Sequence, residues 1–486
     1  MSNMPAALTP HIDALRDIVG PTYVMTDSTD AAPYLRDWTG DYVADIPCVV
    51  FPASTAEVSA VMRYAFSHGQ TIHPQGGNSG LVSGSQASAP DTGLILNLKR
   101  MSKIRELSPA DYTATVEAGC IVQTLQEAAK ADNRLFPLSF GAEGSAQIGG
   151  ALSTNAGGLN VLRYGMARDL VLGLEVVLMD GTILNALSQL RKDNRGLDLK
   201  QMFLGTEGAL GIITAASLKL FPATTSRETA FLAVGSVSEA VALFDLARSY
   251  CADLLTAFEL IPRPCLEMAI AHQSGLRDPL EAPSEWYVLM DLTCSGPLQL
   301  RPLIEGFLEA AMTKELVHDG VLAENLTQVH ALWAIREAMV EAQVTKGRHL
   351  RTDISVPLSK ISAFIDAAHQ TLSEHAPGWI PLSYGHVGDG NIHFNALPPS
   401  AMAEDDRRHH INALLPLIYD VVDGLNGSIS AEHGIGRARL APHLARQPEA
   451  QRQLTQQIKA LLDPTGQMNP GCLIPLAPNS DDTRDR

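Results

Sequence analysis

Two histidines and an asparagine stand out in the segment GHVGDGNIHFNAL, which spans residues 385–397. The turn-forming letters VGDGN lie between two apolar runs and predict a β-hairpin that brings His386 and His393 to one end. Residues two apart on a strand share a face, so Asn395 should lie beside His393. This face suits a site for a metal and a substrate, but a core hairpin with satisfied polar groups remains the alternative.

A third metal ligand is offered by GSISAEHGIGRAR, residues 427–439. Glu432 and His433 lie there between a short apolar run and a glycine turn. A carboxylate with two imidazoles is a common open ligand set for a catalytic divalent metal. The alternative for these two residues is an exposed pair that caps a helix.

Two glycine-rich loops could hold a large cofactor. The first is PQGGNSGLVSGS (74–85) and the second is FPLSFGAEGSAQIGGALSTNAGGLNVLRYG (136–165). Glycines let consecutive amides approach a diphosphate closely. The first loop lacks the GKS or GKT ending of a P-loop, and no GxGxxG motif opens a helix there. One such loop could simply be flexible, whereas two attached to α+β structure indicate the walls of one cofactor site.

The elements that would position these loops are indicated by local patterns. Residues 47–54 are predicted to form a strand, residues 55–69 a helix capped by Thr55, and the following residues a second strand. The segment 169–184 predicts a hairpin that turns at Asp180-Gly181. Pro, Thr and Ser cluster at 222–230, which indicates a domain boundary.

The net charge, the apolar runs and the cysteines of the chain indicate which kinds of protein it could be. The 486 residues include 36 basic and 53 acidic ones, a net charge of −17, which argues against binding to nucleic acid or to an anionic membrane. No apolar run is long enough for a bilayer span and no signal segment is seen, so we expect a cytoplasmic protein that is not integral to a membrane. Six scattered cysteines without a CxxC pair suit buried thiols.

The pair PQGGNSG and IGGALSTNAGG, together with FLGTEGALGIIT at 203–214, resembles the flavin-binding domain of the vanillyl-alcohol-oxidase type. The resemblance implies an α+β fold with a two-subdomain FAD-binding domain (1–226), an α+β substrate or cap domain with the metal site (227–460), and a C-terminal segment near the flavin (461–486). It implies that the cofactor contacts Gly76, Gly77, Asn78, Ser79, Gly80, Gly141, Gly144, Ser145, Gly149, Gly150, Thr154, Asn155, Gly157, Gly158 and Ile213. Covalent members often have histidine in the first loop where this chain has Asn78, so we expect noncovalent FAD.

GHVGDGNIHFN and SAEHGIG resemble the C-terminal motifs of FAD-linked D-2-hydroxyacid dehydrogenases. The resemblance makes His386, His393 and Glu432 the ligands of Zn²⁺ or another divalent metal. It makes His433 the catalytic base, which takes the hydroxyl proton as the α-hydrogen leaves as hydride for the flavin. Asn395 would bind the C1 carboxylate or the hydroxyl of the substrate.

The resemblance also indicates the substrate. In hydroxyglutarate dehydrogenases, positions matching Arg336 and Arg351 bind the distal carboxylate. Here Arg351 replaces the usual lysine and Val340 the usual threonine, so one hydrogen bond is lost while the charge is kept. The leading substrate is D-2-hydroxyglutarate, oxidised to 2-oxoglutarate; the alternatives are a D-lactate dehydrogenase or a glycolate oxidase subunit.

Three further points are expectations. The electron acceptor would be an electron-transfer flavoprotein or a quinone, because no nicotinamide-binding motif is present. A homodimer is possible. The competing classes are a flavin-free metallohydrolase and a noncatalytic flavin-binding subunit, and the intact His433 argues against the second.

Overall fold

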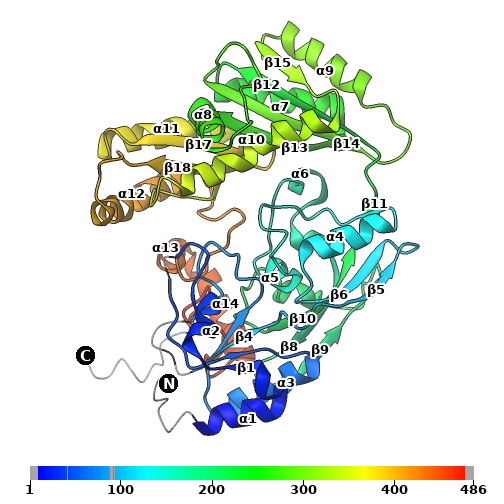
Figure 1. Cartoon of the computed structure of the whole chain (residues 1–486), viewed down its shortest axis with the longest axis vertical. Helices are drawn as coiled ribbons and strands as arrows, with labels where there is room; N and C mark the ends of the chain where they lie inside the picture. Colours follow the sequence, from blue (N-terminus) through cyan, green and yellow to red (C-terminus); the bar gives the residue numbers. More distant parts are fainter. Residues whose placement is uncertain (1–8, 41, 88–90, 92, 477–486) are drawn as a thin grey trace. The chain divides into compact units, whose positions relative to one another are not determined.

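The chain folds into two compact units. The computed structural model describes residues 9–40, 42–87, 91 and 93–476 (Figure 1). The first unit contains residues up to Gly157, Met166–Pro222 and the residues from Glu432 onward; the second contains Gly158–Gly165 and Ala223–Ala431. One division between the units falls between Pro222 and Ala223, within the segment 222–230. The predicted domains 1–226, 227–460 and 461–486, with their roles, stay predictions.

The described residues of the first unit form three sheets. One has the strand order β1-β2-β4-β3, with β1 at Val24–Met25, β2 at Val49–Val50, β4 at Leu94–Asn97 and β3 at Ile72–Gln75. A five-stranded sheet has the order β5-β6-β10-β8-β9, with strands at Ile104–Ser108, Thr113–Glu117, Ile212–Lys219, Val171–Val177 and Ile183–Ala186. A small sheet pairs β11 (Phe221–Pro222) with β7 (Arg134–Leu135).

The helices of the first unit are α1 (Thr9–Val19), α2 (Ser28–Leu35), α3 (Thr55–Ser67), α4 (Val122–Ala131), α5 (Ile148–Ser153), α13 (Leu440–Arg446) and α14 (Glu449–Leu462). The strand-helix-strand prediction is confirmed, because β2 and β3 both run parallel to β4 and α3 connects them. The predicted cap is wrong: Ser54 accepts the backbone N–H of Glu57, while the Thr55 hydroxyl donates to Glu175 instead. The hairpin at Asp180-Gly181 is confirmed by the antiparallel pairing of β8 with β9.

The second unit is built on one seven-stranded antiparallel sheet with the order β15-β12-β14-β13-β17-β18-β16. In that order the strands are Asp319–Leu322, Ser226–Val234, Trp286–Cys294, Leu255–Pro262, Ile380–His386, Asn391–Leu397 and Ile354–Ser355. The helices are α6 (Val161–Tyr164), α7 (Val237–Cys251), α8 (Arg263–His272), α9 (Arg301–Thr313), α10 (Leu326–Val344), α11 (Ile361–His375) and α12 (Glu404–Gly424).

The two faces of this sheet have separate cores. Helices α7, α9, α11 and α12 pack on one face, where Ile392 and Phe394 of β18 are fully buried. Helices α8 and α10 pack on the other face with Leu382 and Tyr384 of β17. Because side chains alternate along a strand, the residue between Ile392 and Phe394 must point toward the side of α8 and α10.

The predicted histidine hairpin is the pair β17 and β18. A single 3-10 turn, Val387–Asp389, joins the strands, and Gly390 closes it with a φ of +81°. A side chain at this position would also meet the carbonyl oxygen of Val356, so only glycine fits. Among the described residues, no helix is long and apolar enough to cross a bilayer.

Candidate active site

The hairpin places three predicted site residues on the buried face that α8 and α10 cover. His393 on β18 lies directly opposite Tyr384 on β17, and their rings are 5.2 Å apart. The His386 and His393 rings are 5.6 Å apart. His386, His393 and Asn395 are each less than a tenth exposed. The structure therefore brings together the polar groups that the sequence placed on one face.

Glu259 on β13 holds two of the predicted site residues. Its Oε1 lies 2.5 Å from His386 Nδ1, and its Oε2 accepts Arg336 Nε at 2.9 Å. Burial of this carboxyl opposes its ionisation, but the charges and hydrogen bonds of His386 and Arg336 outweigh burial and lower the pKa of Glu259 from 4.5 to about 2. Glu259 is therefore an ionised carboxylate shared between an imidazole and a guanidinium.

The amide of Asn395 is fixed by three neighbours. Its Nδ2 donates to Gln343 Oε1 at 2.8 Å and to the Tyr384 hydroxyl at 3.2 Å, and its Oδ1 accepts the Thr352 backbone N–H at 3.2 Å. Burial raises the pKa of Tyr384 to about 12, so this hydroxyl stays protonated. Both amide hydrogens are occupied, which leaves the Asn395 oxygen as the group that can accept a further hydrogen bond.

Asp353 is a site residue that the sequence did not reveal. It is completely buried, its Oδ1 accepts Asn391 Nδ2 at 3.0 Å, and His393 Nδ1 lies 4.0 Å from the same oxygen. The Ala431 N–H donates to Asp353 Oδ2 at 3.2 Å, and the chain then continues directly into Glu432 and His433. The signal that could have revealed Asp353 was its position as a carboxylate just before the short strand β16.

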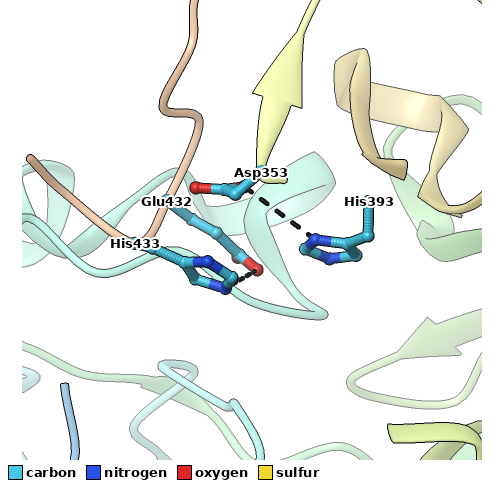
Figure 2. Close-up of side chains that lie close together, drawn as sticks. All are labelled: Asp353, His393, Glu432 and His433. Atoms are coloured by element: carbon cyan, nitrogen blue, oxygen red, sulfur yellow. Dashed lines mark ion pairs between the residues drawn. The ribbon is translucent and has the colours of Figure 1, made fainter. Parts of the chain in front are cut away.

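Figure 2 shows the four side chains that lie close together: Asp353, His393, Glu432 and His433. Each offers one ligand atom, and these atoms all lie within 4.8 Å of one another. Imidazole nitrogens and carboxylate oxygens are donors that Zn²⁺ accepts, so this donor set fits a divalent metal. His386 is not a member of the cluster. The predicted ligand set of His386, His393 and Glu432 stays a prediction.

The residues predicted to receive the far end of the substrate differ in exposure. Arg336 is 8% exposed, and its guanidinium lies 5.1 Å from the centre of the Tyr384 ring. Arg351 is exposed, and Val340 is 41% exposed. Arg336 alone of these three residues belongs to the buried polar cluster around Glu259.

The two glycine-rich loops lie against each other within the first unit. A side chain at Gly77 would collide with the carbonyl oxygen of Ser145, and one at Gly76 would contact Gln147 and Gly150. Gln147 Oε1 is buried and has no hydrogen-bond partner among the described residues. By contrast, a Cβ would meet open space at Gly80, Gly141 and Gly150. The close approach of the two loop backbones and the unsatisfied acceptor Gln147 Oε1 fit a site that binds FAD.

Other residues predicted to contact the cofactor shape these loops. Asn78 and Asn155 adopt positive φ, and the Asn78 side chain donates to the carbonyls of Pro33 and Arg36. The Thr154 hydroxyl donates to the Gly150 carbonyl. The remaining members lie in or beside the second loop (Gly144, Gly149, Gly157), in the first loop (Ser79), at the start of the second unit (Gly158) and buried on β10 (Ile213).

The end of the second loop lies beside the predicted metal ligand Glu432. A Cβ at Gly157 would lie 3.1 Å from Glu432 Oε2, and both residues belong to the first unit. The turn after His433 is held by Glu207, whose two carboxylate oxygens accept the backbone N–H groups of Ile435 and Gly436, each at 2.7 Å. Sequence reasoning missed Glu207, although it lies in the quoted motif FLGTEGALGIIT.

Comparison with known proteins identifies the family. The model described as "FAD binding domain" matches residues 46–187, and that described as "FAD linked oxidases, C-terminal domain" matches 223–473. The chain is 37% identical over 463 residues to "D-2-hydroxyglutarate dehydrogenase, mitochondrial" of Bos taurus, covering 95% of this chain and 83% of that protein. It is 32% identical over 460 residues to "D-2-hydroxyglutarate dehydrogenase" of Stutzerimonas stutzeri (strain A1501), covering 95% and 98%. The chain belongs to the FAD-linked oxidases.

Solved structures of remote sequence share the fold of this FAD-linked oxidase. p-Cresol methylhydroxylase with bound substrate has a TM-score of 0.77 at 17% identity, covering 98% of each chain. 4-Ethylphenol oxidase from Gulosibacter chungangensis has a TM-score of 0.74 at 18% identity, covering 98% of this chain and 99% of that one. The predicted α+β fold of the vanillyl-alcohol-oxidase type is confirmed.

One prediction is wrong on this comparison. We expected a cytoplasmic protein, but the relatives from Oryza sativa, Bos taurus and Arabidopsis thaliana are named as mitochondrial. The expectation rested on composition and on the lack of an apolar span. Neither property distinguishes one aqueous compartment from another, so neither could have given the location.

Proposed function

We propose that this FAD-linked oxidase oxidises D-2-hydroxyglutarate to 2-oxoglutarate. The observation that carries the proposal is the buried polar face of the β17-β18 hairpin, where two imidazoles, an amide and Arg336 lie together. The similarity of the chain to D-2-hydroxyglutarate dehydrogenases supports the same substrate. A dicarboxylic 2-hydroxy acid needs groups for two carboxylates and one hydroxyl. This face, with Arg351 and His433, supplies all three kinds.

The roles follow from the chemistry of each group. Asn395 contacts the end of the substrate that has C1 and the hydroxyl, and Arg336 with Arg351 binds the distal carboxylate. His433 takes the hydroxyl proton, because an imidazole titrates near neutral pH. FAD, bound noncovalently by the two glycine-rich loops, supplies the oxidant that accepts the α-hydrogen together with its electron pair.

A divalent metal completes the proposed site. His386, His393 and Glu432 would hold it, with Asp353 adjacent to His393, and Zn²⁺ matches these donors. Bound there, the ion would act as a Lewis acid toward the substrate hydroxyl. His386 is suited to ligation, because Glu259 bonds its Nδ1 and fixes the ring, so that Nε2 is the nitrogen that would bind the metal.

Anaerobic titration of the purified protein with D-2-hydroxyglutarate tests the function. We expect the flavin absorbance near 450 nm to bleach in proportion to substrate, and 2-oxoglutarate to form in equal amount (about one per flavin). L-2-Hydroxyglutarate is the stereochemical control. An oxidised flavin after prolonged exposure to the D-enantiomer would refute the substrate.

Metal removal tests the second part of the proposal. Dialysis against EDTA should suppress bleaching while the flavin stays bound, and Zn²⁺ should restore it. Bleaching at the original rate in protein shown to be free of metal would refute the metal role. The experiment needs no assumption about the electron acceptor, for which an electron-transfer flavoprotein or a quinone remains our expectation.

D-Lactate is the second candidate substrate. The chain is 34% identical over 454 residues to "Putative D-lactate dehydrogenase C713.03, mitochondrial" of Schizosaccharomyces pombe, covering 92% of this chain and 85% of that protein. D-Lactate has no distal carboxylate and cannot use Arg336. A higher kcat/KM for D-lactate than for D-2-hydroxyglutarate would favour this candidate.

A further inference from the structure

Glu259 belongs to no motif, yet it lies at the centre of the buried polar face. It is the one charged residue of β13, whose sequence is LTAFELIP, and it is 1% exposed. Its neighbours Phe258 and Leu260 face the core of α7, α9, α11 and α12, so the Glu259 side chain points toward α10. A carboxylate buried this deeply in an apolar strand requires compensating partners.

The two oxygens of Glu259 have different partners. Oε1 faces His386 Nδ1 at 2.5 Å, and Oε2 accepts Arg336 Nε at 2.9 Å. A carboxylate only accepts hydrogen bonds, so Nδ1 of His386 carries a proton, and the neutral ring that binds a metal then has its lone pair on Nε2. The bond to Nε fixes the plane of the Arg336 guanidinium, which also lies against the Tyr384 ring.

We propose that Glu259 is a positioning residue that sets two parts of the site at once: the tautomer and orientation of His386 toward the metal, and the orientation of Arg336 toward the distal carboxylate. The inference rests on the proposed function, because that function assigns the roles of His386 and Arg336. One carboxylate thus couples metal binding to the choice of a dicarboxylate substrate.

Glu259→Gln separates this role from simple packing. Glutamine has nearly the same shape, but its amide has one acceptor oxygen and one NH₂ donor. If the oxygen stays with Arg336, the NH₂ group faces His386 and forces the proton onto Nε2, which then cannot bind a metal. If the oxygen turns to His386, the NH₂ group opposes Arg336. Either arrangement damages one function, and exchange between them damages both.

The first readout is metal affinity and does not involve turnover. The flavin-loaded protein, stripped of metal, is titrated with Zn²⁺ alone in competition with a chelating dye. We expect Glu259→Gln to bind Zn²⁺ about 10–100-fold more weakly than the wild type, the usual effect of removing a group that orients a ligand. Zn²⁺ affinity within twofold of the wild type, together with an unchanged KM for D-2-hydroxyglutarate, would overturn the proposal.

The second readout is substrate preference. KM for D-2-hydroxyglutarate should rise by a larger factor than KM for D-lactate, because only the former uses Arg336. An equal rise for both substrates would overturn the coupling of Glu259 to Arg336. If D-2-hydroxyglutarate does not reduce even the wild-type flavin, the proposed function fails, and the zinc titration then decides the role of Glu259 alone.

Asp291→Asn is the matched control. Asp291 is also buried, lies on the adjacent strand β14, and pairs with Arg227 and Thr229. Its loss breaks a similar ion pair in the same sheet, so Zn²⁺ affinity and the KM ratio should stay at wild-type values. If Glu259→Gln fails to fold, Glu259→Asp keeps both acceptor oxygens one methylene further away. It should weaken Zn²⁺ binding, and unchanged affinity would overturn the proposal.

Discussion

Replacing Glu207 by glutamine should loosen the turn that follows His433. The carboxylate accepts the N–H groups of Ile435 and Gly436 at 2.7 Å and the thiol of Cys472 at 3.3 Å. A glutamine amide has only one acceptor oxygen, so one buried N–H group would face an NH₂ group. An orphaned buried donor costs about 1–3 kcal/mol, and loss of the charge weakens the remaining bond by about 1 kcal/mol.

The neutral glutamine avoids the cost of burying a charge, and this offsets part of the lost hydrogen-bond energy. Burial raises the pKa of Glu207, which means that the ionised carboxylate is held at a cost that the neutral amide avoids. We therefore expect the local opening of the turn to become easier by about 2 kcal/mol, which corresponds to about 30-fold faster amide exchange. Hydrogen-exchange mass spectrometry of peptides that contain residues 433–437 measures this change directly.

The matched control is Glu175→Gln in the same unit. Glu175 is also buried and is bonded by Thr55, Arg105 and Thr214. This variant should speed exchange around β8 and leave residues 433–437 unchanged. If Glu207→Gln exchanges there at the wild-type rate, the carboxylate does not hold the turn and the reasoning fails.

Three other predictions concern the base, the flavin and acid stability. His433→Ala should slow anaerobic reduction of the flavin by D-2-hydroxyglutarate about 10²–10⁴-fold while the flavin stays bound; near-normal reduction would mean that another group takes the proton. Because Asn78 occupies the position of a covalent histidine, acid precipitation should leave the flavin in the supernatant, and a yellow pellet would contradict this. Burial lowers the pKa of His349 from 6.5 to about 4, so the unfolded chain binds an extra proton between these values. Unfolding free energy should therefore fall by up to about 3 kcal/mol as the pH drops from 6.5 to 4, and His349→Gln should flatten this dependence in urea titrations.

The histidine hairpin was predictable because its signals are local. Turn residues lie next to each other in the chain, and a period of two decides which side chains share a face. Those rules place His386, His393 and Asn395 together without any long-range contact. The same kind of rule found the hairpin at Asp180-Gly181 and the parallel unit around α3.

Glu259 and Asp353 were not found because their partners are distant in sequence. Glu259 contacts His386 across 127 positions, and Asp353 contacts the Ala431 amide across 78. A single carboxylate within LTAFELIP was nevertheless a usable signal, because an acidic residue in a buried strand needs a partner. The sequence could indicate that a partner exists, but not which one.

The return of the chain to the first unit after Ala431 was also beyond local patterns. Residue 432 has no change in composition that marks it as a boundary. The return is fixed by long-range contacts, such as the bridge between Ile72 and Met468 and the bonds of Glu207 to the turn at 435–436. Motif spacing alone could not reveal them.

The site therefore depends on two supports that can be tested separately. Glu259 organises His386 and Arg336 entirely within the second unit, on a sheet whose opposite face is an independent apolar core. Glu207 organises the turn after His433 entirely within the first unit. Glu259→Gln should consequently leave amide exchange at 433–437 unchanged, even where it weakens Zn²⁺ binding. If it also loosened that turn, the two supports would be coupled, and the separation of their roles would be wrong.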